Sequence, residues 1–486
     1  MAASLDRIKF AETLVESDPD EAHRIGCAVL DDEPDNALAL FLIAYIYSKA
    51  ERYGLAYTIN KRIVQLAPHR DQAWCNLGMC LESMDRHAEA RECFEQAAKR
   101  DPKNAAYPAN IALTYQTECR YETALKWAEK ALQMDPAHKP AMGTVGFASL
   151  AMGDWARGWK GYESCLGGKF RNSYCYGDEP VWDGVSRGTV VVYGEQGIGD
   201  EIMIGSMLAD AAEHATIVYD CHPRLANLFK RSFPFAEVHG TRKATALPWL
   251  VGRTVDYNIA GMSLGQHFRP TPESCPGTPF LKADPDRVYQ WKALFDSWGK
   301  RPKIGLCWSG GGRHTGIKGR EMGLEAFRGV IETLDADFVS LQYKDPTKEI
   351  EASGLPVRHF ARAVEAQDYD ECAGLVGALD LVIGVNTSAH HLAGGLGVPS
   401  VVFVPTHPLW LYARDQVEFY GSWTLFRQKT GETWDRTVSR WLDDTDLGRL
   451  RSARSAGVSH VLPVCDRPRL AAGRVQSAVA GAAAGL

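Results

Sequence analysis

The sequence predicts a protein of class α + α/β, with a superhelix of helical repeats followed by two Rossmann-like lobes. Two observations predict this class. In the first third of the chain, prolines recur every 34 residues, at Pro34, Pro68, Pro102 and Pro136. Past Gly168, short β-rich runs alternate with helical segments, and this rhythm occurs twice. A chain of 486 residues is also too long for one hydrophobic core, so several domains are expected.

The 34-residue period is that of the tetratricopeptide repeat, in which each unit is a pair of helices. Small residues such as Gly78 and Ala90 allow the two helices of a unit to approach closely. We therefore expect a tetratricopeptide-repeat domain over residues 1–165, with weaker copies around the best one. That best copy carries the residues of the repeat pattern, with leucine in place of tyrosine at one position: Trp74, Leu77, Gly78, Leu81, Ala90, Phe94, Ala97 and Pro102.

Two asparagines occupy equivalent positions in successive repeats. Asn76 and Asn110 are one period apart, so their amides should project from equivalent places on the inner helices. An amide ladder of this kind can hold the backbone of a bound polypeptide. The alternative is that asparagine is only a tolerated polar residue on an exposed helix face, since two rungs are few.

The sequence of the remaining two thirds of the chain predicts two lobes and a tail. A proline-rich stretch over 269–279 separates two groups of strands, so we expect one lobe over 185–280 and another over 281–445. Residues 446–486 are rich in Ala, Gly and Arg, which predicts a flexible tail. A cleft between such lobes, lined by loops at the carboxyl ends of strands, is the expected ligand site. The β-rich runs predict buried parallel strands at 190–193, 216–219, 304–308, 338–341, 381–385 and 401–404.

Two loops that follow predicted strands carry the chemical signal. The first, over 194–200, contains three glycines that allow a tight turn, and it ends on the carboxylate of Asp200 near a helix N-terminus. It matches neither the dinucleotide-binding pattern nor the P-loop pattern. The second, over 384–393, opens a helix whose free N–H groups predict an anion cradle. In this loop, the side chains of Asn386, Thr387 and Ser388 would also contact the bound anion.

Both loops resemble those of a known family. Gly197-Ile-Gly-Asp-Glu201 and the segment 386–399 look like the signature loops of heptosyltransferase-like glycosyltransferases, which have the GT-B fold. The segments 153–163, 338–342 and 425–428 resemble bacterial tetratricopeptide-repeat glycosyltransferases, some of which modify flagellin. The resemblance covers roughly residues 35 to 441.

The resemblance implies a GT-B enzyme that moves a sugar from a nucleotide-sugar to a protein acceptor, with flagellin as one candidate acceptor. The repeats would recruit this acceptor, through Asn76 and Asn110. Asp200 matches the family's general base, and the loop from Asn386 to His391 matches the loop that grips the donor's phosphates. No metal and no cofactor are implied, because the nucleotide-sugar is a substrate. The family usually begins the second loop with Asp-Thr, and the asparagine at 386 leaves open an inactive interaction scaffold.

Sugar transfer also needs groups that stabilise the charge on the departing phosphate. The candidates are the glycine-rich turn of the second lobe and the basic residues after it: Ser309, Gly310, Gly311, Arg313, Lys318 and Arg320. Gln342, at the end of a strand, is a candidate contact to the nucleotide base or ribose. Each choice has an alternative. Asp200 can serve as a helix cap and have no catalytic role, and the basic residues can form a solvated loop.

Charge and composition argue against several other functions. With 54 basic and 60 acidic residues, the net charge of −6 does not favour a nucleic-acid partner. The 12 cysteines form no C-x-x-C pair, which argues against a zinc ribbon and a disulfide-rich secreted scaffold. Neighbouring residues on a helix point about 100° apart, so the pair His390 and His391 does not predict a metal site.

The sequence also predicts where the protein works. No apolar run approaches the ~18 residues that a membrane-spanning helix needs. We therefore expect a cytoplasmic protein. A lipopolysaccharide-type sugar transferase would require a basic or amphipathic surface facing the membrane, and the sequence shows no such stretch, so this alternative is less favoured.

Overall fold

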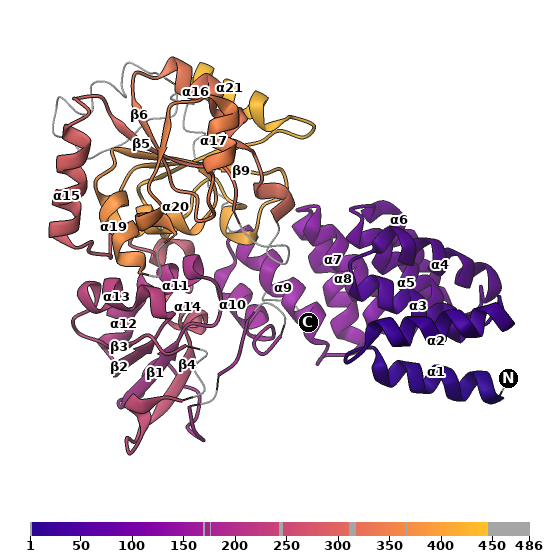
Figure 1. The fold of residues 1–486 in the computed structure, drawn as a ribbon. Helices are drawn as coiled ribbons and strands as arrows, with labels where there is room; N and C mark the ends of the chain where they lie inside the picture. The colour runs from indigo at the N-terminus through magenta and orange to yellow at the C-terminus, as the bar shows by residue number, and fades with distance from the viewer. Residues whose placement is uncertain are drawn as a thin grey trace, which may run out of the picture.

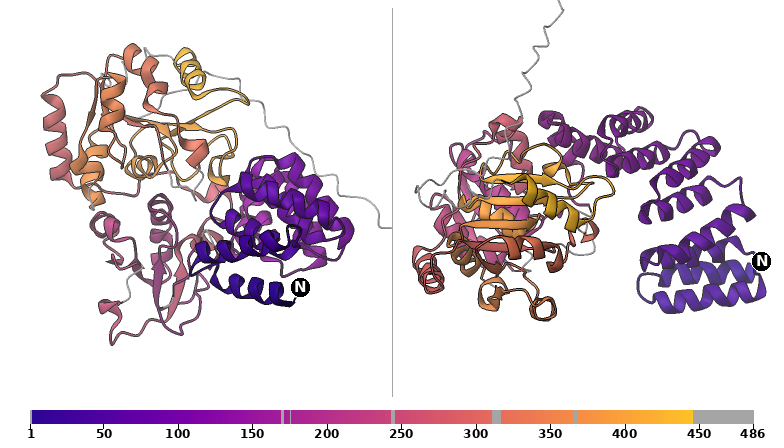
Figure 2. Two further views of the ribbon diagram at one scale, coloured as in Figure 1. Left: turned by 45° about the vertical axis from the view of Figure 1, so that its right-hand side comes forward. Right: turned by 90° about the horizontal axis from the view of Figure 1, so that it is seen from above.

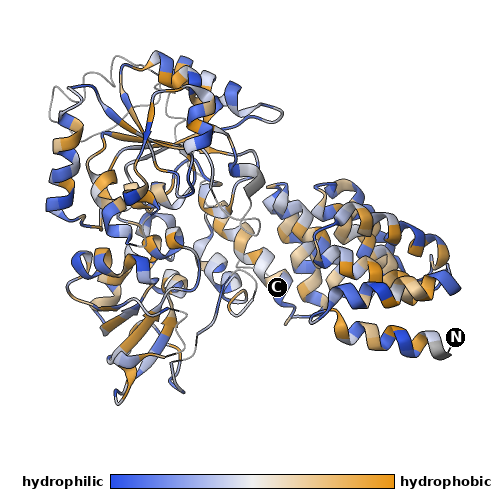
Figure 3. Ribbon diagram, viewed as in Figure 1, coloured by the Kyte–Doolittle hydropathy of each residue, from blue (hydrophilic) through white to orange (hydrophobic). Residues whose placement is uncertain are grey.

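The computed structural model describes residues 2–168, 171–174, 176–242, 246–310, 317–365 and 368–445. Its first part is helical, and Figures 1 and 2 show the helices stacked in pairs into a superhelix beside the rest of the chain. In Figure 3 these helices alternate between apolar and polar segments along their length, as helices with one buried face do. The helices are α1 (Ala2–Leu14), α2 (Pro19–Asp32), α3 (Ala37–Lys49), α4 (Tyr53–Leu66), α5 (Asp71–Ser83), α6 (His87–Arg100), α7 (Ala106–Thr117), α8 (Tyr121–Met134), α9 (Lys139–Met152) and α10 (Trp155–Glu163).

The turns inside the four helix pairs from α3 to α10 share one backbone feature. Glu51, Asp85, Cys119 and Gly153 all have positive φ, at 58°, 61°, 57° and 90°, and each is one repeat period from the next. The close approach of paired helices is equally specific, because a Cβ atom added at Gly78 would stand 2.7 Å from the Phe94 ring. The predicted tetratricopeptide architecture is therefore present.

Two parallel sheets follow the repeats. The first has the order β3-β2-β1-β4 and the second the order β10-β9-β8-β5-β6-β7. The predicted strands are all present, each within one residue of its expected bounds. The sequence missed β3, β4, β7 and β10. The strands are β1 (Thr189–Tyr193), β2 (Thr216–Asp220), β3 (Glu237–His239), β4 (Tyr257–Ala260), β5 (Lys303–Cys307), β6 (Asp337–Ser340), β7 (Val357–His359), β8 (Leu381–Val385), β9 (Ser400–Val404) and β10 (Trp423–Arg427).

Both sheets are doubly wound. In each, the strand that comes first in the chain lies between the second and the fourth, so the strand order reverses there. In open sheets of this type the loops on either side of the reversal point diverge and leave a crevice at the carboxyl ends of the strands. The crevices are thus expected after β1 and β4 in the first sheet, and after β5 and β8 in the second.

Helices cover the faces of both sheets. Those of the first sheet are α11 (Ile198–Gly205), α12 (Leu208–Ala212), α13 (Ala226–Ser232) and α14 (Gly265–Phe268), with the short 3-10 helices η1 (Pro223–Leu225) and η3 (Gly261–Leu264). After β4 the chain continues through α15 (Pro285–Asp296), α16 (Arg328–Thr333), α17 (Thr347–Ser353), α18 (Ala361–Val364), α19 (Tyr369–Gly377), α20 (Ser388–Leu396) and α21 (Trp434–Asp444), with the 3-10 helices η6 (Ile317–Arg320), η7 (Leu324–Phe327) and η8 (Trp410–Tyr412).

The last helix of the superhelix, α10, packs on both sheet regions. Trp155 stacks on Phe419, with ring centroids 5.6 Å apart, and Trp159 donates a hydrogen bond from Nε1 to the Arg269 carbonyl at 2.7 Å. These contacts join the repeats to both sheets through one buried aromatic cluster. Among the described residues, no helix is long and apolar enough to cross a bilayer.

Candidate functional site

The first candidate loop lies where the crevice of the first sheet is expected. It leaves β1 at Gly194 and places Asp200 in the first turn of α11. The Gly197 N–H donates to Asp200 Oδ2 at 3.1 Å, so Asp200 caps its own helix through one carboxylate oxygen. Burial raises the pKa of Asp200, although the positive charges of Arg320 and Arg242 oppose this rise. A raised pKa makes the carboxylate a stronger base, so the cap does not exclude a catalytic role.

A buried ion pair holds the backbone of this loop in place. Arg242 pairs with Glu201 and also donates from Nη1 to the Gln196 carbonyl at 2.5 Å. Glu201 Oε2 in turn accepts the His222 N–H at 2.7 Å. Burial raises the pKa of Glu201 to about 7, against the effect of Arg242. Arg242 and Glu201 therefore hold the backbone that carries Asp200.

A second buried pair connects the same loop to the repeats. Arg171 donates from Nη2 to Glu195 Oε1 at 3.1 Å and from Nη1 to the Tyr162 carbonyl of α10 at 3.1 Å. Arg171 and Glu195 are both fully buried. This pair was not singled out from the sequence, because its members lie in different segments and only the fold brings them together.

The second candidate site combines two loops of the second sheet. Ser309 and Gly310 follow β5, and Asn386 follows β8. A Cβ atom at Gly310 would stand 2.4 Å from Thr387 Cγ2, so the two loops touch. Arg320, at the end of η6, donates from Nη1 to the Asn386 carbonyl at 3.4 Å. The structure therefore brings these predicted donor-binding residues together at the carboxyl edge of the sheet.

The polar groups at this edge fit an anionic ligand. Asn386 is only 3% exposed, and its Oδ1, which accepts no hydrogen bond within the described part of the chain, suits a ligand hydroxyl rather than an anionic oxygen. Ser388 starts α20, so the N-terminus of that helix opens at the same place. Helix N-termini and nearby guanidinium groups favour phosphate and carboxylate oxygens.

Gln342 lies in this region, but its amide is engaged by protein groups. With the amide turned so that both of its ends are satisfied, Nε2 donates to the Ser309 carbonyl at 2.9 Å and Oε1 accepts the Ser309 N–H at 2.9 Å. The side chain thus fixes the loop after β5. Its predicted contact with a nucleotide stays a prediction.

His391 lies where the two regions meet. Its ring nitrogens pair with the hydroxyl groups of Tyr420 at 2.8 Å and Tyr412 at 3.0 Å. Burial lowers the pKa of His391 to about 3, so the ring is neutral. A Cβ atom added at Gly199 would stand 2.9 Å from His391 Cδ2, which places α20 directly against α11. In this structure His391 connects the two helices, and its predicted contact with donor phosphates stays a prediction.

The remaining predicted residues lie elsewhere. Asn76 on α5 accepts a hydrogen bond from Gln72 Nε2 at 2.7 Å. On α7, the Nδ2 atom of Asn110 lies 3.7 Å from Cys75 Sγ. Both are half-buried. Gly311 and Arg313 lie outside the described residues, as does the side chain of Lys318.

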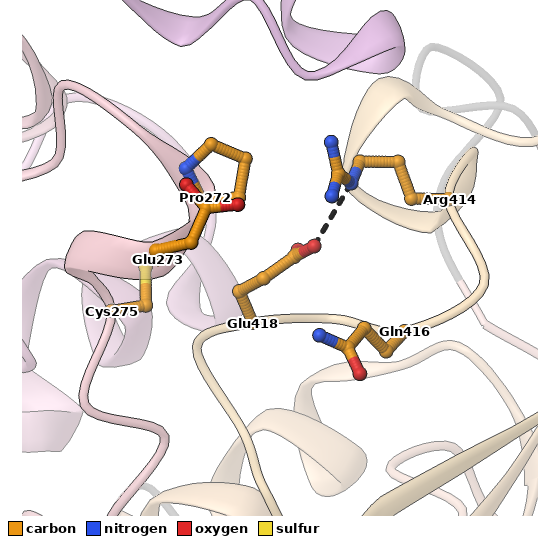
Figure 4. A pocket seen from close by; sticks show the side chains of 6 residues that line it. All are labelled: Pro272, Glu273, Cys275, Arg414, Gln416 and Glu418. Atoms are coloured by element: carbon orange, nitrogen blue, oxygen red, sulfur yellow. Dashed lines mark hydrogen bonds and ion pairs between the residues drawn. The ribbon is translucent and has the colours of Figure 1, made fainter. Parts of the chain in front are cut away.

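A small pocket of about 150 Å³ lies apart from these loops (Figure 4). Arg414 Nε and Glu418 Oε1 pair across part of it at 2.9 Å. It includes none of the predicted site residues. Its lining comes from the connection after the first sheet and from the segment after η8: Pro272, Glu273, Cys275, Arg414, Gln416 and Glu418.

A group with metal-binding side chains also lies apart from the candidate loops. Asp345, His359 and Glu365 have potential ligand atoms within 4.8 Å of one another. His359 Nε2 and Glu365 Oε1 lie 2.8 Å apart, as in an ion pair that needs no metal.

Comparisons with known proteins identify the repeats. Two models of the tetratricopeptide repeat match residues 72–104 and 109–138. Protein FlbA of Caulobacter vibrioides is 28% identical over 470 residues, which are 90% of this chain and 77% of that protein. The repeat prediction is therefore confirmed.

Shorter matches connect the chain with glycosyltransferases. The probable UDP-N-acetylglucosamine–peptide N-acetylglucosaminyltransferase SPINDLY of Eustoma exaltatum subsp. russellianum is 36% identical over 70 residues, covering 14% of this chain and 8% of that protein. SPINDLY of Petunia hybrida is 30% identical over 98 residues, covering 20% of this chain and 10% of that protein. The chain thus contains tetratricopeptide repeats and has partial similarity to protein glycosyltransferases.

Solved structures resemble about a third of the chain. The crystal structure of MamA protein has a TM-score of 0.30 and 20% identity, covering 33% of this chain and 88% of that one. The crystal structure of PilW, a type IV pilus biogenesis factor, has a TM-score of 0.31 and 20% identity, covering 33% of this chain and 77% of that one.

Proposed function

We propose that this chain is a metal-independent GT-B glycosyltransferase that transfers a sugar from a nucleotide-sugar to a protein acceptor. The observation that carries the proposal is the contact of α11 with α20, which brings the loop after β1 next to the loop after β8. A GT-B enzyme needs this juxtaposition, because the acceptor and the donor must meet between its two lobes. The shared identity with SPINDLY proteins supports the transfer of a sugar to protein.

Each part of the chain has a role in this proposal. The repeats, over 1–165, recruit the acceptor protein, with flagellin as the first candidate from the sequence resemblance. The lobe over 185–280 presents the acceptor hydroxyl, and the lobe over 281–445 binds the nucleotide-sugar. We expect the reaction in the cytoplasm.

The chemistry requires removal of one proton and stabilisation of one leaving group. Asp200 takes the proton of the acceptor hydroxyl as that oxygen attacks the anomeric carbon. The bond from the anomeric carbon to the phosphate oxygen breaks, and the nucleotide leaves with negative charge on its terminal phosphate. Arg320 and the N–H groups at the start of α20 stabilise that charge. No step requires a metal ion.

Calorimetry with UDP, GDP, ADP and CMP tests the donor site. We expect one of these nucleotides to bind the wild-type chain and to bind Arg320→Ala at least about tenfold more weakly, a loss of ~1.4 kcal/mol. Arg358→Ala is a matched control, because Arg358 is a partly exposed arginine on β7, where it pairs with Asp337. Failure of all four nucleotides to bind would contradict the proposal.

A second candidate function is an interaction scaffold that has lost transferase activity. The observation that favours it is Asn386, which stands where the resembling family usually has aspartate. Intact-mass analysis of candidate acceptors coexpressed with the chain separates the two functions. A transferase adds the mass of a sugar to an acceptor that the repeats bind, whereas a scaffold binds the acceptor without changing its mass.

A further inference from the structure

The last repeat helix, α10, reaches the loop that carries Asp200 through the side chain of Tyr162. Tyr162 is only 3% exposed, and its hydroxyl accepts a hydrogen bond from Gln196 Nε2 at 2.9 Å. Phe147 of α9 packs edge to face on the tyrosine ring, with ring centroids 5.2 Å apart. Arg171 Cζ lies 4.7 Å from the centroid of the same ring. The Tyr162 hydroxyl therefore has little freedom to move independently of α9 and α10.

Arg171 makes a second connection between α10 and this loop. Besides its bonds to the Tyr162 carbonyl and to Glu195, it donates from Nη2 to Ser263 Oγ at 2.8 Å and from Nη1 to Glu163 Oε2 at 3.2 Å. Ser263 Oγ itself donates to Glu163 Oε2 at 2.6 Å. A guanidinium group is planar and presents its donors in a rigid fork, so it fixes its partners relative to one another. Arg171 thus holds the end of α10 and the start of the loop in one arrangement.

Both connections end directly before the hydrogen bond that holds Asp200. Glu195 and Gln196 precede Gly197 in the chain, and the Gly197 N–H donates to Asp200 Oδ2 at 3.1 Å. A displacement of Gln196 moves Gly197 through the peptide bond between them, and Gly197 moves the carboxylate through this hydrogen bond. The position of the Asp200 carboxylate therefore depends on the position of α10.

Helices α9 and α10 behave as one body, because their backbones touch. A Cβ atom added at Gly146 on α9 would stand 2.6 Å from the carbonyl carbon of Gly161 on α10, and a Cβ atom at Gly161 would stand 2.6 Å from Gly146 Cα. Closely packed elements of this kind transmit a displacement instead of absorbing it. Helix α10 also contacts α14 of the first sheet region, beside which it lies in Figure 1.

We propose that Tyr162, supported by Arg171, is a positioning residue for Asp200, so that the last helix pair of the repeats, α9 and α10, is a part of the catalytic unit. A general base must lie within hydrogen-bond reach of the proton that it takes, and a small displacement of the base slows the reaction steeply. The catalytic role of Asp200 rests on the proposed function, whereas the link from α10 to the loop does not.

Tyr162→Phe in the full chain tests this role, because it removes the hydroxyl and keeps the packed ring. Gln196 is half-buried, so water can satisfy its amide and the variant should fold. We expect the single-turnover rate of sugar transfer to fall at least about tenfold. The KM for the nucleotide-sugar should stay at the wild-type value, since the donor loops follow strands of the other sheet. Amide hydrogen exchange in the segment 194–201 should become about fivefold faster.

Tyr107→Phe is the matched control. Tyr107 on α7 is also buried, and its hydroxyl donates to Asp71 on α5, within the repeats and away from the loop of Asp200. This variant loses one tyrosine hydrogen bond as Tyr162→Phe does. It should leave the rate of transfer and the exchange of the segment 194–201 unchanged.

A double-mutant cycle shows whether Tyr162 acts through Asp200. When the base is already removed by Asp200→Asn, adding Tyr162→Phe should slow the residual transfer by less than about twofold. An equal fall in both backgrounds would overturn the inference, because Tyr162 would then act on another group. Wild-type transfer by Tyr162→Phe, or a rise in KM with no fall in the transfer rate, would overturn it as well.

Hydrogen exchange keeps this inference distinguishable from the proposed function. A wild-type chain that transfers no sugar contradicts the proposed function. In such a chain, faster exchange of the segment 194–201 in Tyr162→Phe would still support the link from α10 to the loop, and unchanged exchange would overturn that link.

Discussion

Gly199 and His391 are in direct contact, although they lie on helices α11 and α20, which follow strands of different sheets: a Cβ atom added at Gly199 would stand 2.9 Å from His391 Cδ2. His391 has little freedom to move away, because two tyrosine hydroxyls hold its ring nitrogens. The spacing between α11 and α20 therefore depends on a residue without a side chain at this position.

Gly199→Ala should separate these two helices slightly. We expect a loss of about 1–3 kcal/mol in the free energy of unfolding, as for other overpacked sites, together with weaker nucleotide binding. Thermal unfolding and calorimetry measure the two effects. Gly54→Ala is the control, because nothing lies within 4 Å of a Cβ atom there. Equal stability of the two variants would show that the contact between α11 and α20 is loose.

Glu201 should make the stability of the fold depend on pH. Its pKa is raised from 4.5 to about 7 in the folded chain, so the unfolded chain releases this proton first as pH rises. The wild type should therefore lose stability relative to Glu201→Gln between pH 4.5 and about 7, by roughly 3 kcal/mol at ~1.4 kcal/mol per unit. Urea unfolding of both chains across this range measures the difference. Wild-type stability that stays constant or rises relative to Glu201→Gln across this range would mean that Arg242 keeps Glu201 ionised.

Metal removal should not stop the reaction. The groups that would stabilise the leaving phosphate are Arg320 and the N-terminus of α20, which carry positive charge without a metal ion. We expect the same turnover in excess chelator as in added manganese or magnesium. Activity that is lost in chelator and restored by manganese would show that a metal supplies this charge instead.

Local patterns were sufficient to predict the repeats and the central strands. The 34-residue period fixes the helix pairs, and continuous apolar runs such as 381–385 mark strands that are buried along their length. The missed strands give weaker signals. β3 and β7 have only three residues each, and most residues of β10 are half-buried, so none shows a long apolar run.

The candidate site was predictable only as far as its loops. Glycine-rich segments after strands located Asp200 and Asn386, since this pattern depends on neighbours in the sequence. The contacts that fix these loops join distant segments, such as Arg242 with Glu201 and Gln342 with Ser309. Such pairs depend on the three-dimensional packing of separate elements, and one sequence gives no local sign of them.

The role of Asp200 is the central claim, and Asp200→Asn tests it most directly. Asparagine can still accept the Gly197 N–H that now bonds Oδ2, but it cannot take a proton from an acceptor hydroxyl. Asp183→Asn is the matched control, because Asp183 also accepts backbone N–H groups, from Val185 at 3.0 Å and Ser186 at 2.7 Å, away from the candidate loops.

The measurement is single-turnover sugar transfer at saturating nucleotide-sugar for the wild type and the two variants. We predict a fall of at least ~100-fold for Asp200→Asn, with nucleotide affinity near that of the wild type and a melting temperature within a few degrees of it. Asp183→Asn should transfer sugar at the wild-type rate. Transfer by Asp200→Asn at a third of the wild-type rate or faster would contradict the claim and leave Asp200 as a helix cap alone.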